Sequence, residues 1–439
     1  KTIMIYSNLF FGVYFIIYSL FIINNTSILE PYKFLVYDLF SDGKMIFKGL
    51  EAFKGFLMLF NFWTGSLFYL SAEMWGSVVL SLLFFGCINE VCPLRQALRF
   101  YPLFLISANI ALTLSGIIGI SVPTLVNDDT DRIFSFYYFF LIFIGLLCFL
   151  NIFIYRNLMN KIIPYPQYIL TTKQQKKTKT KVGVKDGIIL AFSNPIILCL
   201  SVSVLSYGIV TNLTEGAYNS TIKLAAELNK DTSAAASTMK MKAIQQVSIG
   251  LVTISCLISP LKTLIQNKGW LSLGLISPIV SLIGSLIFFM FVWVNVKRTM
   301  TDNGLLTRCA RYIAELFKFD IKTIETEKIL GLIVTSTIKI LKYAAFDICK
   351  EAVGVKIPKQ HRSRFKGVYD GVFGKLGKSV SSIIQIFLLS LYNSNDVRVA
   401  ITLLGAGVVS ITVVWVISTL YIGKEYSLAE RENRELNII

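Results

Sequence analysis

Residues 60–103 read FNFWTGSLFYLSAEMWGSVVLSLLFFGCINEVCPLRQALRFYPL. The first part of this stretch is apolar over a length that can cross a bilayer, yet it carries one carboxylate, Glu73, among aliphatic and aromatic neighbours. An ionisable side chain at bilayer depth costs at least about 2.5–3.5 kcal/mol, so it is usually kept only where it lines a polar cavity or pairs with another charge. The sequence therefore predicts a membrane protein with a solute pathway.

The composition of the whole chain agrees with a membrane protein. Of its 439 residues, 54% are hydrophobic and only 16% are charged, well below the roughly 25% charged share of a soluble domain. The formal net charge of +17 would indicate nucleic-acid binding in a soluble protein, but here the basic residues lie mostly between the apolar runs. We therefore expect a lipid bilayer around the protein and no nucleic-acid partner.

Metal and nucleophilic chemistry have little support in the sequence. The seven cysteines are scattered without a CxxC pair, and the single histidine, His361, lies in a basic loop. This pattern argues against a zinc site, a disulfide framework and a histidine-dependent triad. We expect no metal, no cofactor and no catalytic residue, and hence a protein that is not an enzyme.

Ten apolar runs are long enough to cross about 30 Å of hydrocarbon. They lie at 2–23, 57–86, 101–122, 134–155, 195–215, 246–265, 270–294, 330–350, 370–391 and 398–422. The fourth run is followed by a hydrophilic stretch, 161–185, which is rich in lysine and contains no acidic residue. By the positive-inside rule this stretch is cytoplasmic, and the basic segments 88–100, 262–269 and 351–367 then fall on the same side.

The basic stretch divides the apolar runs into four before it and six after it. A long cytoplasmic linker between two six-span bundles is typical of major-facilitator-like transporters, so we expect an all-α polytopic protein of that two-bundle fold. About ten of twelve spans would be present, and because the chain begins with Lys rather than Met, two spans are expected to be missing at its start. An irregular ten-span protein with a long loop is the alternative. The expected parts are an N-terminal helical bundle at 1–156, a basic linker at 157–190, a C-terminal six-helix bundle at 191–423 and a charged cytoplasmic tail at 424–439.

Polar residues recur at helical spacing within two of the apolar runs. The stripe in the run around Glu73 is formed by Ser66, Tyr69, Glu73 and Ser77. The broader polar face of the run that starts at 195 is formed by Tyr207, Thr211, Asn212, Glu215 and Asn219. Because spacings of three and four place side chains on one face of a helix, each set forms a polar seam in an apolar rod.

A third run, 330–353, combines cations with aromatic rings. Its residues Lys339, Tyr343, Phe346 and Lys350 lie on nearly one face, with Lys342 and Asp347 beside it. Cations and aromatics together suit an anionic ligand that contains a ring. In the alternative interpretation, Lys339 and Lys342 extend to the lipid headgroups, and Asp347 with Lys350 forms only an i,i+3 pair.

The stretch GVFGKLGKSVSS, 371–382, resembles a phosphate-binding loop without matching it. In the motif GxxxxGK[ST] the glycines are five positions apart, whereas Gly371 stands six residues before Gly377. Phosphate contact at the start of a helix, by Lys378 and its neighbours at 374–379, is one interpretation. Close helix packing at the glycines is the favoured one.

Several stretches in order along the chain resemble the hallmarks of the ATP/ADP antiporter family of nucleotide transporters, found in plastid envelopes, obligate intracellular bacteria and eukaryotic parasites. They are AEMWGSVVLSLLFFGCINE at 72–90, RFYPLF at 99–104, SYGIVTNLTEG at 206–216, GW at 269–270, KYAAFDICKEAVGVKIP at 342–358 and GKLGKS at 374–379. The similarity covers essentially the whole chain, from the third span of a twelve-span protein to its end. Met74 stands where the family usually has Leu, which is a conservative change.

The resemblance implies exchange of external ATP for internal ADP by alternating access, with ATP and ADP as the partners and a monomeric carrier. It maps the family's charged positions onto Glu73, Glu215 and Lys350. The candidate substrate-binding residues are Glu73, Glu215, Lys350, Lys342, Asn212, Tyr207, Asp347 and Lys378. A proton-coupled or broad-specificity nucleotide importer is the alternative, because the motifs do not separate these modes.

Other classes of function fit the sequence less well. A polytopic membrane enzyme would need an acid–base or metal constellation at one interface, which a lone histidine and scattered acids do not provide. A scaffold or receptor does not require buried Glu and Lys on several spans. The composition, rich in Phe, Ile, Lys and Asn, favours a multi-pass protein in the plasma membrane of an intracellular parasite over one in a plastid or other organelle envelope.

The charge pattern makes a prediction about sidedness. A protease added to intact cells should not cut within residues 157–190 or 351–367, and a membrane-impermeant thiol reagent should not label a cysteine introduced into either segment, because both are expected on the cytoplasmic face. Permeabilised cells provide the control, in which both segments should become accessible. Access from the outside of intact cells would show that the orientation is reversed.

Overall fold

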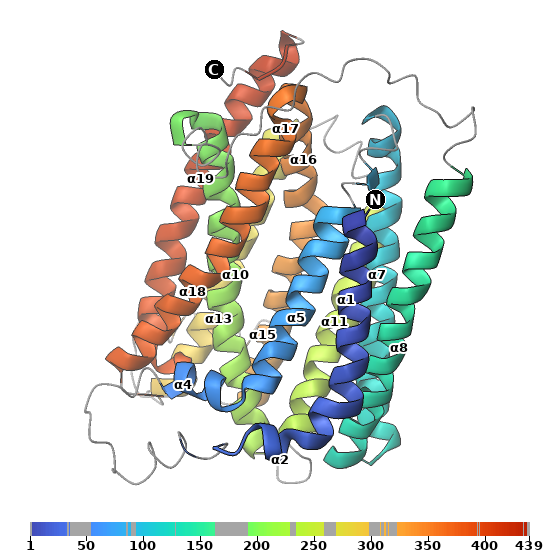
Figure 1. The fold of residues 1–439 in the computed structure, drawn as a ribbon. Coiled ribbons are helices and arrows are strands. Elements are labelled where there is room, and N and C mark those ends of the chain that lie inside the picture. The colour runs from blue at the N-terminus through green and yellow to red at the C-terminus, as the bar shows by residue number, and fades with distance from the viewer. Residues whose placement is uncertain are drawn as a thin grey trace. The chain divides into compact units, whose positions relative to one another are not determined.

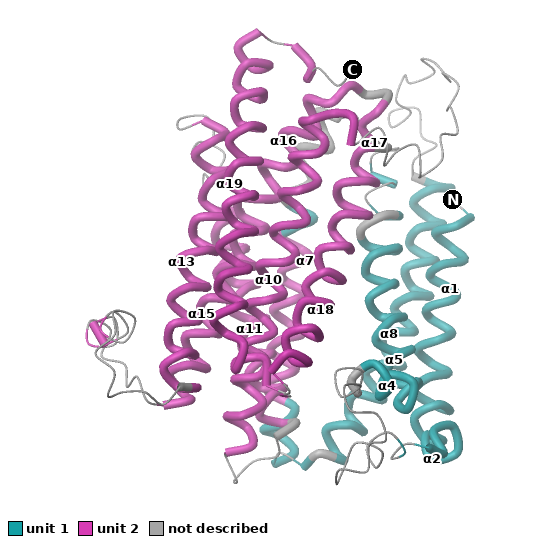
Figure 2. The backbone as a smooth tube through the Cα atoms, turned by 90° about the vertical axis from the view of Figure 1, so that its left-hand side faces the viewer, with its two compact units in different colours: residues 1–105, 122–180 teal, residues 106–121, 181–439 magenta. Residues whose placement is uncertain are grey.

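The structure is a computed structural model. It describes residues 2–32, 35, 54–84, 87–88, 94–127, 129–162, 192–228, 234–258, 269–297, 308, 311–312, 315, 323–392, 394, 396–432 and 434–436. Over these residues the chain forms helices and no strand (Figure 1). The chain divides into two compact units, which are coloured in Figure 2. The N-terminal unit comprises Lys1–Leu105 and Val122–Thr180, and the C-terminal unit comprises Ile106–Ser121 and Lys181–Ile439.

Nine helical stretches among the described residues are long and apolar enough to cross a membrane, which confirms the expected all-α polytopic class. They are Thr2–Leu29, Leu103–Leu125, Asp131–Lys161, Pro195–Leu228, Ala236–Ile258, Trp270–Val296, Ile324–Lys356, Gly367–Leu391 and Val397–Arg431. Each overlaps one of the ten runs expected from the sequence. The remaining run, 57–86, is helical over its described residues 57–61 and 63–84, with a turn at Phe62 between α4 and α5, and residues 85 and 86 lie outside the described residues.

The N-terminal unit is built around the contact between α1 and α8. Its helices are α1 (Thr2–Ile17), η1 (Tyr18–Ile22), η2 (Ile23–Asn25), α2 (Thr26–Leu29), α4 (Lys54–Asn61), α5 (Trp63–Trp75), η4 (Gly76–Phe84), α8 (Thr130–Asn157) and η5 (Leu158–Ile162). Helix α7 (Leu94–Leu125) contributes its two ends, while its central part belongs to the C-terminal unit. Glycines let α1 and α8 approach closely, because a Cβ atom on Gly145 would lie 2.6 Å from the Cγ1 atom of Ile16.

The C-terminal unit is arranged around α10. Its helices are α10 (Pro195–Leu228), α11 (Ala234–Ile258), α13 (Trp270–Lys297), α15 (Ile324–Leu341), η6 (Lys342–Phe346), α16 (Asp347–Lys356), α17 (Lys359–Lys366), η7 (Gly367–Val372), α18 (Phe373–Leu391), η8 (Val397–Ala400) and α19 (Ile401–Arg431). Helix α10 packs against α11, α15, α18 and α19. In its most apolar window 67% of the residues are buried, compared with 22% for the span that contains α18, so α10 is the central helix of this unit.

Helices α10 and α18 touch backbone to backbone. A Cβ atom on Gly377 would lie 2.8 Å from the carbonyl oxygen of Leu205 and 3.1 Å from the Cα atom of Gly208. Gly377 lies inside a continuous helical stretch that runs from Lys359 to Leu391, so no helix begins there. The interpretation of 374–379 as a phosphate site at a helix start is therefore wrong, and close helix packing at Gly377 is confirmed.

This close approach predicts a stability effect. Gly377→Ala should destabilise the protein by about 1–3 kcal/mol, because the new methyl group meets backbone atoms that cannot move aside. The thermal midpoint of the purified protein in detergent measures the effect. Gly371→Ala is the matched control, since a Cβ atom there meets nothing within 4 Å. Equal midpoints for the two variants would contradict the close contact.

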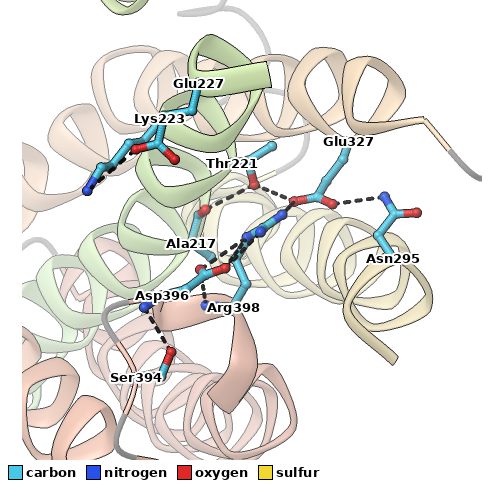
Figure 3. Close-up of polar contacts among 9 residues, drawn as sticks. All are labelled: Ala217, Thr221, Lys223, Glu227, Asn295, Glu327, Ser394, Asp396 and Arg398. Atoms are coloured by element: carbon cyan, nitrogen blue, oxygen red, sulfur yellow. Dashed lines mark hydrogen bonds and ion pairs between the residues drawn. The ribbon is translucent and has the colours of Figure 1, made fainter. Parts of the chain in front are cut away.

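A buried polar network joins four elements at the end of the C-terminal unit where α15 begins (Figure 3). The carboxylate of Glu327, fully buried, accepts hydrogen bonds from Arg398 at 3.2 Å, from the amide of Asn295 at 2.8 Å and from the hydroxyl of Thr221. The guanidinium of Arg398 also makes two-pronged contact with Asp396, at 2.7–3.1 Å. The network thus ties α10, α13, α15 and η8 together.

The network predicts a large cost for removing its cation. Arg398→Met should lower the free energy of unfolding by about 3–5 kcal/mol, because it leaves the buried carboxylate of Glu327 without its counter-charge. The control is Arg434→Met, whose partner Glu432 has a 55% exposed side chain, and it should change stability by at most about 0.5 kcal/mol. Thermal denaturation in detergent compares the two variants. Equal losses of stability in both would show that the ion pair of Arg398 with Glu327 contributes no more to stability than the exposed pair of Arg434 with Glu432.

Candidate substrate site

The carboxylate of Glu215 is held by two lysines from neighbouring helices. Its Oε1 atom lies 2.8 Å from the ammonium of Lys339 on α15 and 3.1 Å from that of Lys242 on α11. The three side chains are 22–32% exposed on the protein, and each belongs to a helix long enough to cross a membrane. Two positive charges and one negative charge leave it with a net charge of +1.

Sequence reasoning missed Lys242 because it placed the start of the span too late. The expected span begins at 246, whereas α11 begins at Ala234 and contains both Lys240 and Lys242. The end of the expected span, 259–265, lies outside the described residues. A predicted span that included these lysines, instead of beginning after them, would have placed Lys242 within the membrane-spanning helix. The expected extents of the spans at 195–215 and 330–350 were also too short, for the same reason.

Lys342 lies against aromatic rings. Its ammonium is 5.0 Å from the centroid of Tyr343 and 5.8 Å from that of Tyr207, and it makes no ion pair with a carboxylate in the part of the chain that the structure describes. Cation–π contacts of this length are favourable without cancelling the charge. The alternative interpretation, in which Lys339 reaches the lipid headgroups, does not agree with its ion pair to Glu215.

Three aromatic rings from three helices support this region. The ring of Tyr207 stacks on Phe346 with centroids 5.4 Å apart, and the indole of Trp415 meets the ring edges of both, at 6.0 and 5.6 Å. Phe346 and Trp415 are buried, whereas Tyr207 is half-buried. The packing fixes the orientation of the Tyr207 ring next to the ammonium of Lys342. A lysine and aromatic rings are thus in contact in the C-terminal unit.

Lys350 is bound by two carboxylates. Its ammonium lies 2.6 Å from Asp370 on η7 and 3.0 Å from Asp347 one turn earlier. The i,i+3 pair that the sequence suggested exists, and Asp370 is an additional partner that the sequence did not indicate. Lys350 also lines a small pocket of about 20 Å³ beside Trp270, which is large enough for about one water molecule. The segment 351–367 that follows, expected as a loop, is largely helical as the end of α16 and α17.

Two other predicted residues have different environments. The side-chain amide of Asn212 donates to the backbone carbonyl of Gly208 at 2.7 Å. The backbone carbonyl of Asn212 accepts a hydrogen bond from the side-chain amide of Gln385 at 3.1 Å. Asn212 therefore takes part in the contact between α10 and α18, one turn before Glu215. Lys378 is exposed on α18, and its backbone carbonyl accepts from the hydroxyls of Ser381 and Ser382.

Glu73 belongs to the N-terminal unit. It is half-buried on α5, and its carbonyl oxygen accepts a hydrogen bond from the hydroxyl of Ser77 at 2.9 Å. Tyr69, on the same expected stripe, is 72% exposed.

Comparisons with known proteins relate the chain to one family. Residues 1–426 match the family model described as TLC ATP/ADP transporter. The chain is 33% identical over 431 residues to ADP,ATP carrier protein 1 of Paranosema grylli, covering 98% of this chain and 76% of the relative. It is also 33% identical to ADP,ATP carrier protein 1 of Encephalitozoon cuniculi, with 98% and 75% covered. Identity to ADP,ATP carrier protein 1 of Chlamydia trachomatis is 27%, with 86% and 68% covered.

No solved structure matches the chain. The family match extends over nearly all of the residues whose motifs carry the resemblance, and it confirms the expectation of a nucleotide transporter with many membrane spans. Together with the helical spans and the charged clusters inside them, it shows that this chain belongs to the TLC ATP/ADP transporter family.

Proposed function

We propose that the protein exchanges external ATP for internal ADP across a membrane by alternating access. The relatives named above are ADP,ATP carrier proteins, and the family model covers the chain from its first residue to 426. The observation that carries the proposal is the cluster around Glu215, where two lysines at membrane depth share one carboxylate. A partly exposed cationic cluster suits a polyphosphate, because lysine ammonium groups bind phosphate as point charges.

Glu215 acts in this proposal as the counter-ion of the empty carrier. When no nucleotide is present, its carboxylate neutralises Lys339 and Lys242 in part, as the ion pairs at 2.8 and 3.1 Å indicate. The phosphates of a bound nucleotide replace it. The empty carrier then reorients poorly, so transport in one direction requires return of a nucleotide in the other, and exchange becomes obligatory.

The remaining candidate residues take supporting roles. Lys342 adds a positive charge next to Tyr207, whose half-buried ring is oriented for contact with the nucleotide base. Asn212 helps to hold α18 against α10 one turn before Glu215, and Lys378 remains a candidate for phosphate contact from α18. Lys350 forms a charge-compensated cluster with Asp347 and Asp370. Glu73 is proposed to serve as a second counter-ion, in the N-terminal unit.

We place the protein in the plasma membrane of an intracellular parasite, since the relatives come from intracellular organisms. The N-terminal bundle 1–156, the linker 157–190, the bundle 191–423 and the tail 424–439 are the proposed parts. The linker and the segment 351–367 are cytoplasmic in this proposal, because they concentrate positive charge between apolar runs. ADP would then be taken from the cytoplasm of the parasite and ATP from outside it.

The test is nucleotide exchange in proteoliposomes. Vesicles preloaded with ADP should take up labelled ATP, and empty vesicles should not. Glu215→Gln should lower the exchange rate about tenfold, or about 1.4 kcal/mol, at every pH, because the two lysines lose their shared counter-ion. Glu73→Gln should also impair exchange. Glu227→Gln is the matched control on the same helix, since its side chain is 54% exposed and its pair with Lys223 is 3.9 Å long.

An imposed proton gradient distinguishes exchange from proton-coupled uptake. On the proposed mechanism the gradient has little effect on the unmutated protein. A gradient that drives net ATP uptake into empty vesicles, and loses this power in Glu73→Gln or Glu215→Gln, would support the proton-coupled importer and contradict obligatory exchange.

A further inference from the structure

The ionic clusters of the C-terminal unit differ in their balance of charge. Arg398 is shared by two carboxylates, those of Glu327 and Asp396. Lys350 is likewise bound by the carboxylates of Asp347 and Asp370. The cluster at Glu215 has the reverse composition, with two cations on one carboxylate oxygen. Two clusters in this unit are thus over-compensated by acids, while this one retains unbalanced positive charge.

Lys342 increases this excess. It lies three residues after Lys339 on the same continuous helical stretch. Because a helix rises about 1.5 Å per residue, the backbones of the two lysines are less than about one turn apart along the helix axis. No described carboxylate makes an ion pair with it. Lys242, Lys339 and Lys342 therefore bring three positive charges to this region, where Glu215 pairs with the first two and Asp347, already paired with Lys350, attracts the third only at longer range.

Such an excess is costly unless something compensates it. Uncompensated positive charges at membrane depth repel one another and have lost part of their hydration. The side chains of Lys339 and Lys242 remain 27% and 32% exposed, so neither is sealed in the core of the C-terminal unit. An anion with several charges is the ligand that relieves the repulsion most. This argument favours a polyphosphate over a single carboxylate or a single phosphate.

Lys242 is the cation that a structural role explains least. It stands on α11, opposite the α15 lysine, and reaches Glu215 although Lys339 already pairs with that carboxylate at shorter range. Its ammonium lies 5.3 Å from the ring centroid of Tyr218, which is fully buried and so holds the position of the lysine. The lysine is thus supported by a rigid aromatic ring and remains partly accessible.

We infer that Lys242 is a specificity-determining residue. Together with Lys339 and Lys342, it makes the affinity for a nucleotide depend on the number of its phosphate charges. The inference rests on the proposed function for the identity of the ligand as a nucleotide. When the phosphates displace Glu215, Lys242 is released from its ion pair and contacts the terminal phosphate. Its contribution then grows from a nucleoside monophosphate to a diphosphate and to a triphosphate.

The test measures binding of ATP, ADP, AMP and inorganic triphosphate to the purified full chain in detergent. Lys242→Gln should weaken binding about tenfold for ATP and inorganic triphosphate, about threefold for ADP and less than about twofold for AMP, because the lost charge acts on the outer phosphates. Lys242→Arg, which keeps the charge, should retain the order of affinities. Lys223→Gln is the matched control, since that lysine has a 74% exposed side chain on α10.

An equal loss for all three nucleotides, or no loss, would overturn the inference, because a lysine that only supports the fold does not distinguish phosphate number. A second measurement avoids dependence on a variant that fails to fold. ATP should slow modification of Lys242 by an amine-reactive reagent in the unmutated protein more than AMP does, and equal rates would also overturn the inference. If Lys242→Gln shows the graded loss of affinity from ATP to AMP while vesicles show no exchange, the proposed exchange is wrong and the role of Lys242 in phosphate specificity is supported.

Discussion

The pairing of charges inside the apolar spans is the constraint on which the C-terminal unit depends. A charge at bilayer depth is too costly to leave unpaired, so each one that is retained must find a partner on another helix or a ligand. The continuous helical stretch Ile324–Lys356 carries Glu327, Lys339 and Lys350, spaced by about 18 Å and about 16 Å along its axis. Each of them pairs with a different neighbouring element, so these ion pairs fix the position of this helix within its unit.

The close packing of α10 makes these pairings possible. Gly208 and Gly377 bring the backbones of α10 and α18 into contact, and the side chain of Gln385 fits against Gly216 next to Glu215. Because the glycines have no side chain to separate the helices, Gln385 on α18 reaches the backbone carbonyl of Asn212, while other polar groups of α10 hydrogen-bond to α11, α13 and α15. The same helix therefore serves as the centre of the apolar core and as the carrier of the carboxylate that the lysines share.

The three charged clusters have different consequences for transport. The network of Glu327 with Arg398 is buried and fully hydrogen-bonded, so it stabilises one end of the unit and offers nothing to a solute. The pair of Lys350 with Asp370 is compensated in a similar way. Among these three clusters, the one around Glu215 combines partial exposure with excess positive charge. A ligand with several negative charges is expected there, and the family to which the chain belongs is one of ATP/ADP transporters.

The sequence by itself determined the class of the protein, its approximate spans and the charges that matter on single helices. Hydropathy and length suffice for this, because the bilayer imposes them on each helix separately. Glu215 and Lys350 were identified in this way, and Lys242 was not, since a lysine shortens an apolar run even when the helix continues through it. Only the tertiary structure decided which charges meet. The ion pairs of Glu215 with Lys242 and of Lys350 with Asp370 join residues on different helices, and their geometry follows from packing that no local pattern specifies.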